Sequence, residues 1–403
     1  RMTKKSDAPA IRFKGFSDAW EQRKLGELAL FNPKDELPQT FEYVDLESVV
    51  GTEMLSHRTE VKSSAPSRAQ RLAHTGDLFY QTVRPYQKNN YLFEKPDNNY
   101  VFSTGYAQMR PYVDGYFLLS LVQSERFVKV VLDNCTGTSY PAINANDLAE
   151  IEVAAPSDES EAQKIGTIFR SIDNLITLHQ RKFEKLTNVK KSMLEKMFPQ
   201  NGSSYPEIRF KGFTDPWEQR KLGDVVKEIT RNDPESEAPI MMITANNGFI
   251  EQSERYAFNN AGESLKKYIL LKKGELAYNH GASKLRPYGS CFALTTAENA
   301  RIPFVYHCFS AENQNAEFMS IELNGAEIEN QLRKIVSSGA RMDGLLNISF
   351  DEYTSVSVIL PGTEEQDRIA DFFRHLDNLI TLHQRELEKL QNIKKSMLEK
   401  MFV

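Results

Sequence analysis

The chain repeats a helical segment at a distance of 204 positions. The nine letters of Asp173–Arg181, DNLITLHQR, return at Asp377–Arg385, and 22 of 28 positions agree between Ser171–Phe198 and His375–Phe402. A repeat of about 200 residues is too long for a solenoid. Two copies of such a unit predict a molecule with an approximate twofold axis.

A second, shorter repeat precedes the first in each half. The letters WEQRKLG fill Trp20–Gly26 and recur unchanged at Trp217–Gly223. The intervening segments, Gly26–Ala155 and Gly223–Leu360, share an approximate length and few landmarks. The entry motifs and the helices are nearly identical in the two halves, whereas the segments between them have diverged. This pattern predicts two variable domains that perform different versions of one task, each held by the same conserved elements.

We therefore expect four segments. These are a first variable domain at 1–156, its helix at 157–200, a second variable domain at 201–361 and its helix at 362–403. Within the variable domains, β-rich runs follow turn signals, as at Gly76-Asp77 and the matching Gly274-Glu275. The expected fold class is α+β, with two pseudo-twofold-related domains of mixed α/β structure joined by two long antiparallel coiled-coil helices.

The segments after Pro156 and Pro361 carry an apolar stripe with steps of three and four residues, which is typical of a coiled coil. The stripe consists of Ile165, Ile168, Ile172, Leu175, His179, Leu186, Val189 and Met193, and then of Ile369, Phe372, Leu376, Leu379, His383, Leu390, Ile393 and Met397. Because the stripe is too narrow for a globular core, each helix is expected to pair with its twin. We interpret His179 and His383 as polar residues that set the register, with a metal or proton-relay role as the alternative.

Composition narrows the class of protein. No apolar run approaches the length of a membrane span, and no apolar segment follows the charged start, so neither a membrane span nor a signal peptide is expected. Three cysteines without metal-ligand spacing predict reduced thiols in the cytoplasm. A net charge of −5 argues against tight nucleic-acid binding by the isolated chain, so any phosphate contacts would come largely from a partner.

The sequence lacks the common catalytic motifs. It contains no P-loop, no Gly-x-Gly-x-x-Gly after a strand, no His-Glu-x-x-His and no Gly-x-Ser-x-Gly. It also lacks the Asn/Asp-Pro-Pro-Tyr/Phe motif that an adenine methyltransferase would need. We expect a chain that is not an enzyme and that carries no cofactor or metal.

The paired entry motifs, the Gly-Asp/Glu-Leu strands at Gly76 and Gly274, and the repeated helices occur in one order. This combination resembles the specificity subunit of Type I restriction–modification enzymes over essentially the whole chain. The resemblance implies two target-recognition domains, each reading one half of a split, asymmetric site in double-stranded DNA. It also implies that the helices separate these domains and dock two methyltransferase subunits, with two endonuclease–translocase subunits as an optional addition. S-adenosylmethionine would then belong to the methyltransferase, and ATP and magnesium to the endonuclease.

The helices have two expected roles, spacing and docking. A helix from about Gln163 to Phe198 spans roughly 50 Å, which would separate the half-site centres by ~10–15 base pairs at most. The residues expected to pair the helices and to dock the methyltransferase are Ile172, Leu175, His179, Leu186, Val189, Met193, Leu376, Leu379, His383, Leu390, Ile393 and Met397.

Base readout requires polar, planar side chains on loops that reach a groove. The loops Tyr80–Lys88 and Tyr278–Tyr288 occupy equivalent positions and share Arg-Pro-Tyr, and two glycine-led loops, Gly137–Pro141 and Gly339–Gly344, are further candidates. The predicted DNA contacts are Tyr80, Gln81, Thr82, Arg84, Tyr86, Lys88, Thr138, Ser139, Tyr140, Asn279, His280, Ser283, Lys284, Arg286, Tyr288, Arg341 and Asp343. An ordinary surface with a structural Arg-Pro turn is the alternative. Tyr80 and Tyr278 fit a core role equally well.

Two other classes of function remain open. A protein scaffold with two binding domains on a coiled-coil spacer would explain the duplication and the charge without any DNA. An enzyme of unrecognised mechanism is the third possibility. Steep weakening of binding by salt would separate a DNA-binding complex from a scaffold.

Overall fold

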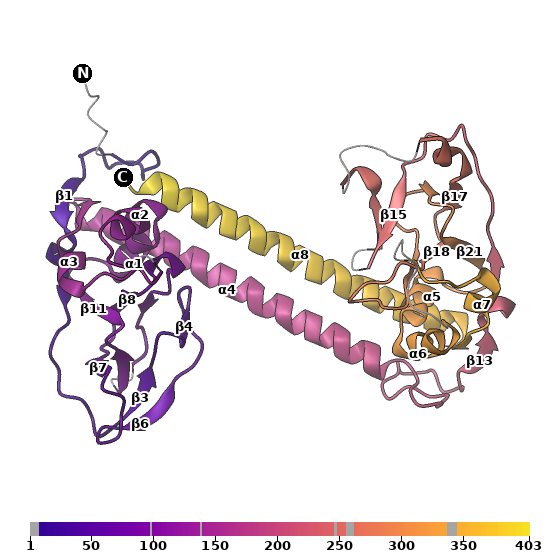
Figure 1. Ribbon diagram of the computed structural model, residues 1–403, viewed down its shortest axis with the longest axis horizontal. Coiled ribbons are helices and arrows are strands. Elements are labelled where there is room, and N and C mark those ends of the chain that lie inside the picture. Colours follow the sequence, from indigo (N-terminus) through magenta and orange to yellow (C-terminus); the bar gives the residue numbers. More distant parts are fainter. Residues whose placement is uncertain (1–7, 97–98, 138, 246–247, 255–261, 337–344) are drawn as a thin grey trace. The chain divides into compact units, whose positions relative to one another are not determined.

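The computed structural model describes residues 8–96, 99–137, 139–245, 248–254, 262–336 and 345–403. They form two compact units, one of residues 1–182 with 383–403 and one of residues 183–382 (Figure 1). The two long helices, α4 (Glu159–Lys196) and α8 (Thr363–Met401), each contribute residues to both units. Each unit therefore combines one variable domain with segments of both repeated helices.

The first unit is built from short strands and short helices. The strands are β1 (Glu21–Lys24), β2 (Ala29–Phe31), β3 (Thr40–Val44), β4 (Val49–Val50), β5 (Glu53–Met54), β6 (Arg58–Val61), β7 (Ala69–Leu72), β8 (Leu78–Gln81), β9 (Tyr91–Leu92), β10 (Tyr100–Ser103), β11 (Tyr106–Pro111) and β12 (Glu152–Ala155). The helices besides α4 are η1 (Leu25–Glu27), η2 (Pro85–Gln87), α1 (Gly115–Gln123), α2 (Glu125–Asp133) and α3 (Ala145–Ala149), where η marks a 3-10 helix.

Two four-stranded sheets organise this unit. One has the order β2-β11-β8-β9, and the other has the order β6-β3-β10-β7, in which only β3 and β10 run parallel. The entry-motif strand β1 pairs with β12, the strand that precedes α4. Polar caps start the helices, since the side chains of Asp114, Ser124 and Asn144 each accept a backbone N–H of the first turn.

The second unit repeats this plan with different loops. Its strands are β13 (Glu218–Lys221), β14 (Val226–Glu228), β15 (Met241–Thr244), β16 (Gly248–Glu251), β17 (Ile269–Lys272), β18 (Leu276–Asn279), β19 (Ser290–Ala293), β20 (Asn299–Ile302), β21 (His307–Ala311) and β22 (Ser357–Leu360). Its helices besides α8 are η3 (Leu222–Asp224), η4 (Gln252–Glu254), η5 (Gly262–Lys267), α5 (Ala316–Leu323), α6 (Ala326–Ile335) and α7 (Phe350–Thr354).

The sheet orders confirm the duplication. The pair β13-β22 and the sheet β14-β21-β18-β19 correspond to β1-β12 and to β2-β11-β8-β9. The second sheet is reduced to two ribbons, β15-β16 and β17-β20, which a single parallel bridge between Ile240 and Arg301 connects. The fold is therefore the expected α+β class with two related domains.

An ion pair fixes the start of each long helix to the segment before the entry motif. The Nε and Nη2 atoms of Arg12 donate to the two carboxylate oxygens of the buried Glu161 at 2.6 and 2.8 Å, and Trp20 Nε1 donates to the same group at 3.3 Å. In the second unit, Arg209 makes the same two-pronged contact with Glu365 at 2.7 and 2.7 Å. Two parallel hydrogen bonds compensate for burying a carboxylate.

The end of α8 packs into the core of the first unit. The ring of Phe402 lies 6.1 Å from Trp20, 5.7 Å from Phe117 and 5.9 Å from Phe169, measured between ring centroids. Phe402 is buried. The first variable domain therefore completes its core with residues from the end of the second repeated helix, as the twofold plan predicts.

The end of α4 completes the second unit in the same way. Phe198 is buried with its ring centroid 5.9 Å from Trp217, 5.7 Å from Phe318 and 6.1 Å from Phe373. The repeated letters Met-Phe at the end of each helix are thus core residues of the unit that contains them.

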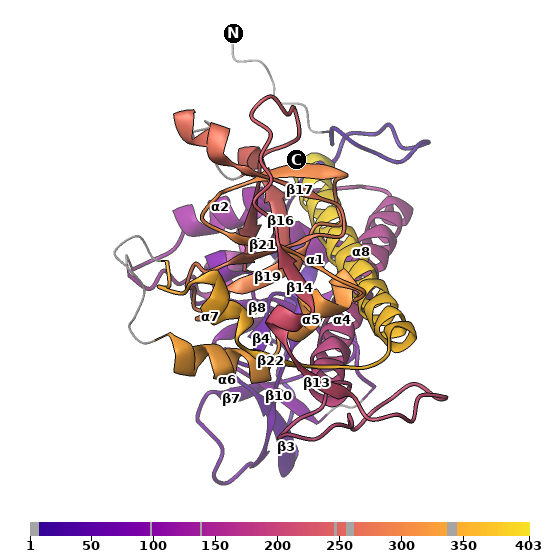
Figure 2. The ribbon, with the colours of Figure 1, turned by 90° about the vertical axis from the view of Figure 1, so that its right-hand side faces the viewer.

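Within each unit, segments of α4 and α8 lie side by side (Figures 1 and 2). In the first unit, Lys394 Nζ lies 2.6 Å from Asp173 Oδ1, and the Nδ1 atoms of His179 and His383 lie 3.1 Å apart. Rising numbers on α4 meet falling numbers on α8, so the segments run antiparallel. The two histidines occupy the helix interface, as expected of polar residues on the stripe.

The register of the stripe differs from the prediction at several positions. Ile172 and Leu376 are buried, and Leu186, Val189 and Met193 pack on the core of the second unit, as Met397 does on that of the first. Leu390 is half-buried. The prediction that Leu175, Leu379 and Ile393 face the paired helix is wrong, since 44%, 44% and 39% of these side chains are exposed. The half-buried Ile176 and Ile380 continue the steps of three and four instead.

None of the helices in the part of the chain that the structure describes has the length and apolar character needed to cross a membrane.

Replacing Phe402 by alanine is expected to lower the free energy of unfolding of the first unit by about 3–5 kcal/mol, the cost of deleting a buried phenyl ring. The matched control is Ile393→Ala on the same helix and in the same unit, where a side chain that is 39% exposed should change stability by less than about 1 kcal/mol. Urea unfolding followed by tryptophan fluorescence in a Trp217→Phe background reports on Trp20 alone. Equal effects of the two substitutions would contradict the packing role.

Candidate nucleic-acid interface

The loop after β8 in the first unit has a strained backbone. Arg84 and Lys88 flank η2 with φ values of 54° and 56°, a left-handed conformation that non-glycine residues rarely adopt. The side chain of Gln81 holds the loop from inside by donating to Val83 O at 2.6 Å and to Gln87 Oε1 at 2.9 Å. Strain that the surrounding structure maintains is common at binding sites, which marks this loop as a candidate.

This loop meets the glycine-led loop of the same domain. Arg84 N donates to Pro141 O at 2.8 Å, and a β-bridge joins Val83 to Ala142. The Arg84 guanidinium lies 4.4 Å from the ring centroid of Tyr140, which is 63% exposed. The two loops thus present a cation and an aromatic ring together, a combination that suits stacking on bases and contact with phosphates.

Several predicted contacts in this loop point inward. Tyr80 is fully buried and its hydroxyl has no hydrogen-bond partner among the described residues, and burial raises its pKa well above the usual value. Gln81 and Thr82 are buried too, and Thr82 Oγ1 donates to Gly105 O at 2.8 Å. These three side chains support the loop from inside, so the prediction that they contact bases is wrong.

The remaining candidates of the first unit lie at its surface. Tyr86 is 50% exposed, and Ser139 is exposed beside Tyr140. Lys88 Nζ is engaged with Glu125 Oε1 at 2.6 Å. Thr138 lies outside the described residues.

In the second unit, side chains of the loop Tyr278–Tyr288 make hydrogen bonds with backbone carbonyls of neighbouring segments, and these bonds hold the loop in place. Both ring nitrogens of the buried His280 face backbone carbonyls, with Nδ1 2.9 Å from Leu346 O and Nε2 2.7 Å from Val305 O. Asn279 Nδ2 donates to Ile243 O at 3.1 Å. A direct DNA contact by His280 is therefore excluded, which corrects the prediction.

Arg286 and Tyr288 also contribute to the interior of this loop. Arg286 Nη1 donates to Asn324 O at 2.7 Å, and burial lowers the pKa of its guanidinium. The carbonyl of Tyr288 accepts the hydroxyl of Tyr278 at 2.6 Å. Ser283 and Lys284 are exposed and stay candidates, whereas Arg341 and Asp343 lie outside the described residues.

A cavity borders the two loops of the first unit, and no pattern in the sequence indicates it. Its volume is about 410 Å³, and Arg71, Thr82, Val83 and Ala142 are among its lining residues. Arg71 belongs to β7, and an arginine in a short strand is usually a solvent-facing residue. The fold places Arg71 beside the two loops, although β7 is separate from both of them in sequence.

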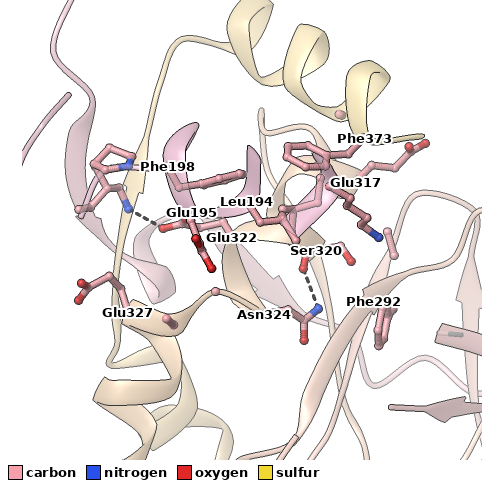
Figure 3. A pocket seen from close by; sticks show the side chains of 18 of the residues that line it. Leu194, Glu195, Phe198, Phe292, Glu317, Ser320, Glu322, Asn324, Glu327 and Phe373 are labelled. Atoms are coloured by element: carbon pink, nitrogen blue, oxygen red, sulfur yellow. Dashed lines mark hydrogen bonds between the residues drawn. The ribbon is translucent and has the colours of Figure 1, made fainter. Parts of the chain in front are cut away.

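A larger cavity, of about 710 Å³, lies in the second unit between α4, α5, α6 and α8 (Figure 3). The apolar side chains of Leu194, Phe198 and Phe373 line it together with the acidic Glu195 and Glu322. Burial raises the pKa of Glu322 to about 7, although Ile359 N donates to its carboxylate at 3.2 Å. The cavity thus combines apolar walls with a carboxyl group that can gain a proton near neutral pH.

The first unit has a cavity of about 500 Å³ lined by the same repeated positions. The equivalent pairs, named with the second unit first, are Lys190 and Lys394, Lys191 and Lys395, Leu194 and Leu398, Glu195 and Glu399, and Asp377 and Asp173. Two cavities that share five lining positions therefore have a part of their surface in common. Among the described residues, no cluster of three or more potential metal ligands occurs.

The sequence of the chain is similar to known proteins over both repeats. Residues 18–188 and 214–392 match the family model described as the Type I restriction modification DNA specificity domain. The Type I restriction enzyme MjaVIII specificity subunit of Methanocaldococcus jannaschii is 25% identical over 308 residues, covering 71% of this chain and 68% of that protein. The MjaIX specificity subunit of the same organism is 27% identical over 128 residues, covering 30% of this chain and 29% of that protein.

A solved structure shares the fold over the whole chain. The Type I restriction–modification S subunit from M. genitalium superposes with a TM-score of 0.62 at 14% identity, covering 98% of this chain and 99% of the other.

The equivalent tyrosines Tyr80 and Tyr278 provide a matched test of the loop geometry. Tyr80→Phe removes a buried hydroxyl without a partner and is expected to raise the free energy of unfolding by about 1 kcal/mol. Tyr278→Phe removes the hydrogen bond to Tyr288 O and should lower that free energy by about 1 kcal/mol. Chemical denaturation of each single variant measures the two shifts, and shifts of the same sign would show that the two hydroxyl environments do not differ.

Proposed function

Because the chain belongs to the family of Type I restriction modification DNA specificity domains, we propose that each unit reads one half of a split DNA site while the paired helices set the gap and dock two methyltransferase subunits. The chain is a specificity subunit and recognises a DNA target without itself catalysing a reaction. The finer assignments below concern which surface performs which task.

The asymmetry of the loops supports two different half-sites. The sheet that carries these loops has the same strand order in both units, yet the loops of the first unit offer Arg84, Tyr86 and Tyr140, whereas the loop of the second offers Ser283 and Lys284. Different donors on one scaffold would select different bases, because base identity is read by the pattern of donors and acceptors. A split and asymmetric target follows.

The weak charge supports shared DNA binding. Phosphate contacts dominate the affinity of DNA-binding proteins, and a chain with a net charge of −5 is a poor source of them. The methyltransferase subunits, which would also carry S-adenosylmethionine, would supply much of this attraction. Endonuclease–translocase subunits with ATP and magnesium would extend the complex, and a cytoplasmic location would give all of them access to DNA.

The repeated surface supports docking of two copies of one partner. Leu175 and Leu178 on α4, and their equivalents Leu379 and Leu382 on α8, are each 44% exposed or more. Exposed leucines at repeated positions indicate a binding surface rather than a core. The cavities that share five lining positions adjoin the same helices, so a partner that fits one unit would fit the other.

The observation that carries the proposal is this combination of repeated helices with diverged loops. A protein scaffold without DNA would show the same repeat, and the methylation pattern of the host distinguishes the two functions. We expect deletion of the gene to remove one split, asymmetric methylated motif from the genome, as read by single-molecule sequencing, and re-expression to restore it. An unchanged map in cells that express both the chain and its methyltransferase would favour the scaffold.

The docking surface can be tested separately. The double variant Leu175→Asp/Leu379→Asp should weaken methyltransferase binding at least tenfold per site, because a partner would have to bury an unpaired carboxylate. The matched control, Asn188→Asp/Asn392→Asp, adds the same charges at exposed repeated positions on the same helices and should leave assembly intact. Light scattering after size exclusion measures the number of bound subunits, and unchanged assembly of the leucine variant would rule out this surface.

A further inference from the structure

We propose that Arg71 reads a guanine in the half-site of the first unit, through paired hydrogen bonds from its guanidinium to one base edge. The inference rests on the DNA-recognition role proposed above and names a side chain that performs it.

Arg71 is half-buried, and no carboxylate among the described residues pairs with its guanidinium. Its Nε atom is buried and makes no hydrogen bond among the described residues, and burial lowers the pKa of the guanidinium. Arg12 and Arg110, which are also partly buried, are paired with the carboxylates of Glu161 and Asp77. A guanidinium that pairs with no carboxylate among the described residues keeps N–H groups that an acceptor from outside the chain can use.

Among the described residues that line the cavity in front of Arg71, no other is a cation. The volume of the cavity is about 410 Å³, and most of its polar side chains are used within the protein. Thr82 donates to Gly105 O, Asn134 donates to Val130 O at 2.9 Å, and Asn144 caps α3. Of the residues that line this cavity, Arg71 is the one with several N–H groups left to donate.

The cavity lies where DNA is expected to approach. Val83 and Ala142, the residues of the bridge that joins the two loops, are part of its wall. The Arg84 guanidinium over the exposed Tyr140 ring belongs to the same junction. A base edge presented at this junction therefore lies beside the cavity that Arg71 lines.

The fold does not require an arginine at this position. Arg71 lies five residues before Gly76, and the residue five positions before the equivalent Gly274 is Ile269. Ile269 is 9% exposed and belongs to the core of the second unit. The twin domain thus fills this position with an apolar side chain, and a difference of this kind is expected where the two half-sites differ.

The chemistry of the cavity favours a base over a phosphate. A guanidinium offers two parallel N–H groups that match the O6 and N7 acceptors of guanine in the major groove. A phosphate could accept the same bonds, but the carboxylate of Asp147 also lines the cavity. A negative side chain repels an anion and tolerates the neutral edge of a base.

The test compares methylated motifs in cells that express the full chain with its methyltransferase. Arg71→Met keeps the length of the side chain and removes its donors, and it should relax a guanine requirement at one position of one half-site, with discrimination reduced roughly tenfold or more. Arg71→Lys should fail to restore it, because an ammonium cannot make the two-pronged contact. The other half-site should be unchanged in both variants.

Arg23→Met is the matched control, since the Arg23 guanidinium is already paired with Glu27 at 3.4 Å. This variant should leave the motif unchanged. Thermal unfolding checks that Arg71→Met folds, which is expected because it removes an unpaired buried group.

Three outcomes separate the possible explanations. An unchanged motif in folded Arg71→Met overturns the inference. Uniformly weaker binding to every sequence, with a shallower salt dependence, indicates a phosphate contact and also overturns it. Absence of any split motif with the wild-type chain contradicts the proposed function itself, independently of Arg71.

Discussion

The structure depends on the packing of each helix end against the entry-motif tryptophan of its unit. Phe402 contacts Trp20, and Phe198 contacts Trp217, at 6.1 and 5.9 Å between ring centroids. The entry motif and the end of the repeated helix are therefore the two sides of one kind of contact, which is made once in each unit. A substitution on either side opens a cavity in a core, which costs several kcal/mol at aromatic positions. This mutual dependence gives a physical reason for the identity of both motifs between the halves.

The same contact explains why the domains can diverge. The entry motif, the strand pair before each long helix and the ion pairs of Arg12 and Arg209 fix the frame of each unit. The loops after β8 and β18 carry none of these contacts, so their sequences can change without loss of the core. Even the frame tolerates small differences, since Trp20 donates to Glu161 whereas Trp217 Nε1 has no partner among the described residues.

Repetition and periodicity are properties of the sequence, and they were sufficient to predict the two domains, the mixed α/β class and the antiparallel helices. The direction in which a loop side chain points, inward or toward solvent, cannot be read from repetition or periodicity. Gln81 and His280 have the side chains of DNA readers, but backbone carbonyls lie close to both and hold them inward. Leu175 was misassigned because the neighbouring Leu175 and Ile176 fit two stripes one residue apart, and only the partner helix selects between them. Arg71 was missed because its surroundings come from segments distant in sequence.

Affinity and discrimination have different physical sources in a protein that reads DNA. Phosphate attraction is strong and indifferent to sequence, whereas a donor placed at a base edge adds little affinity and most of the selectivity. A chain that pairs Arg12, Arg58 and Arg110 with its own carboxylates has withdrawn these cations from phosphate binding. What it keeps free is a donor in a cavity beside an exposed aromatic ring. If partners that bind at the repeated positions supply most of the affinity, the variable domains need to supply only selectivity. Each domain can then change its target by changing a few side chains, such as those at Arg71 and Ile269. The contact between tryptophan and phenylalanine in each core stays the same.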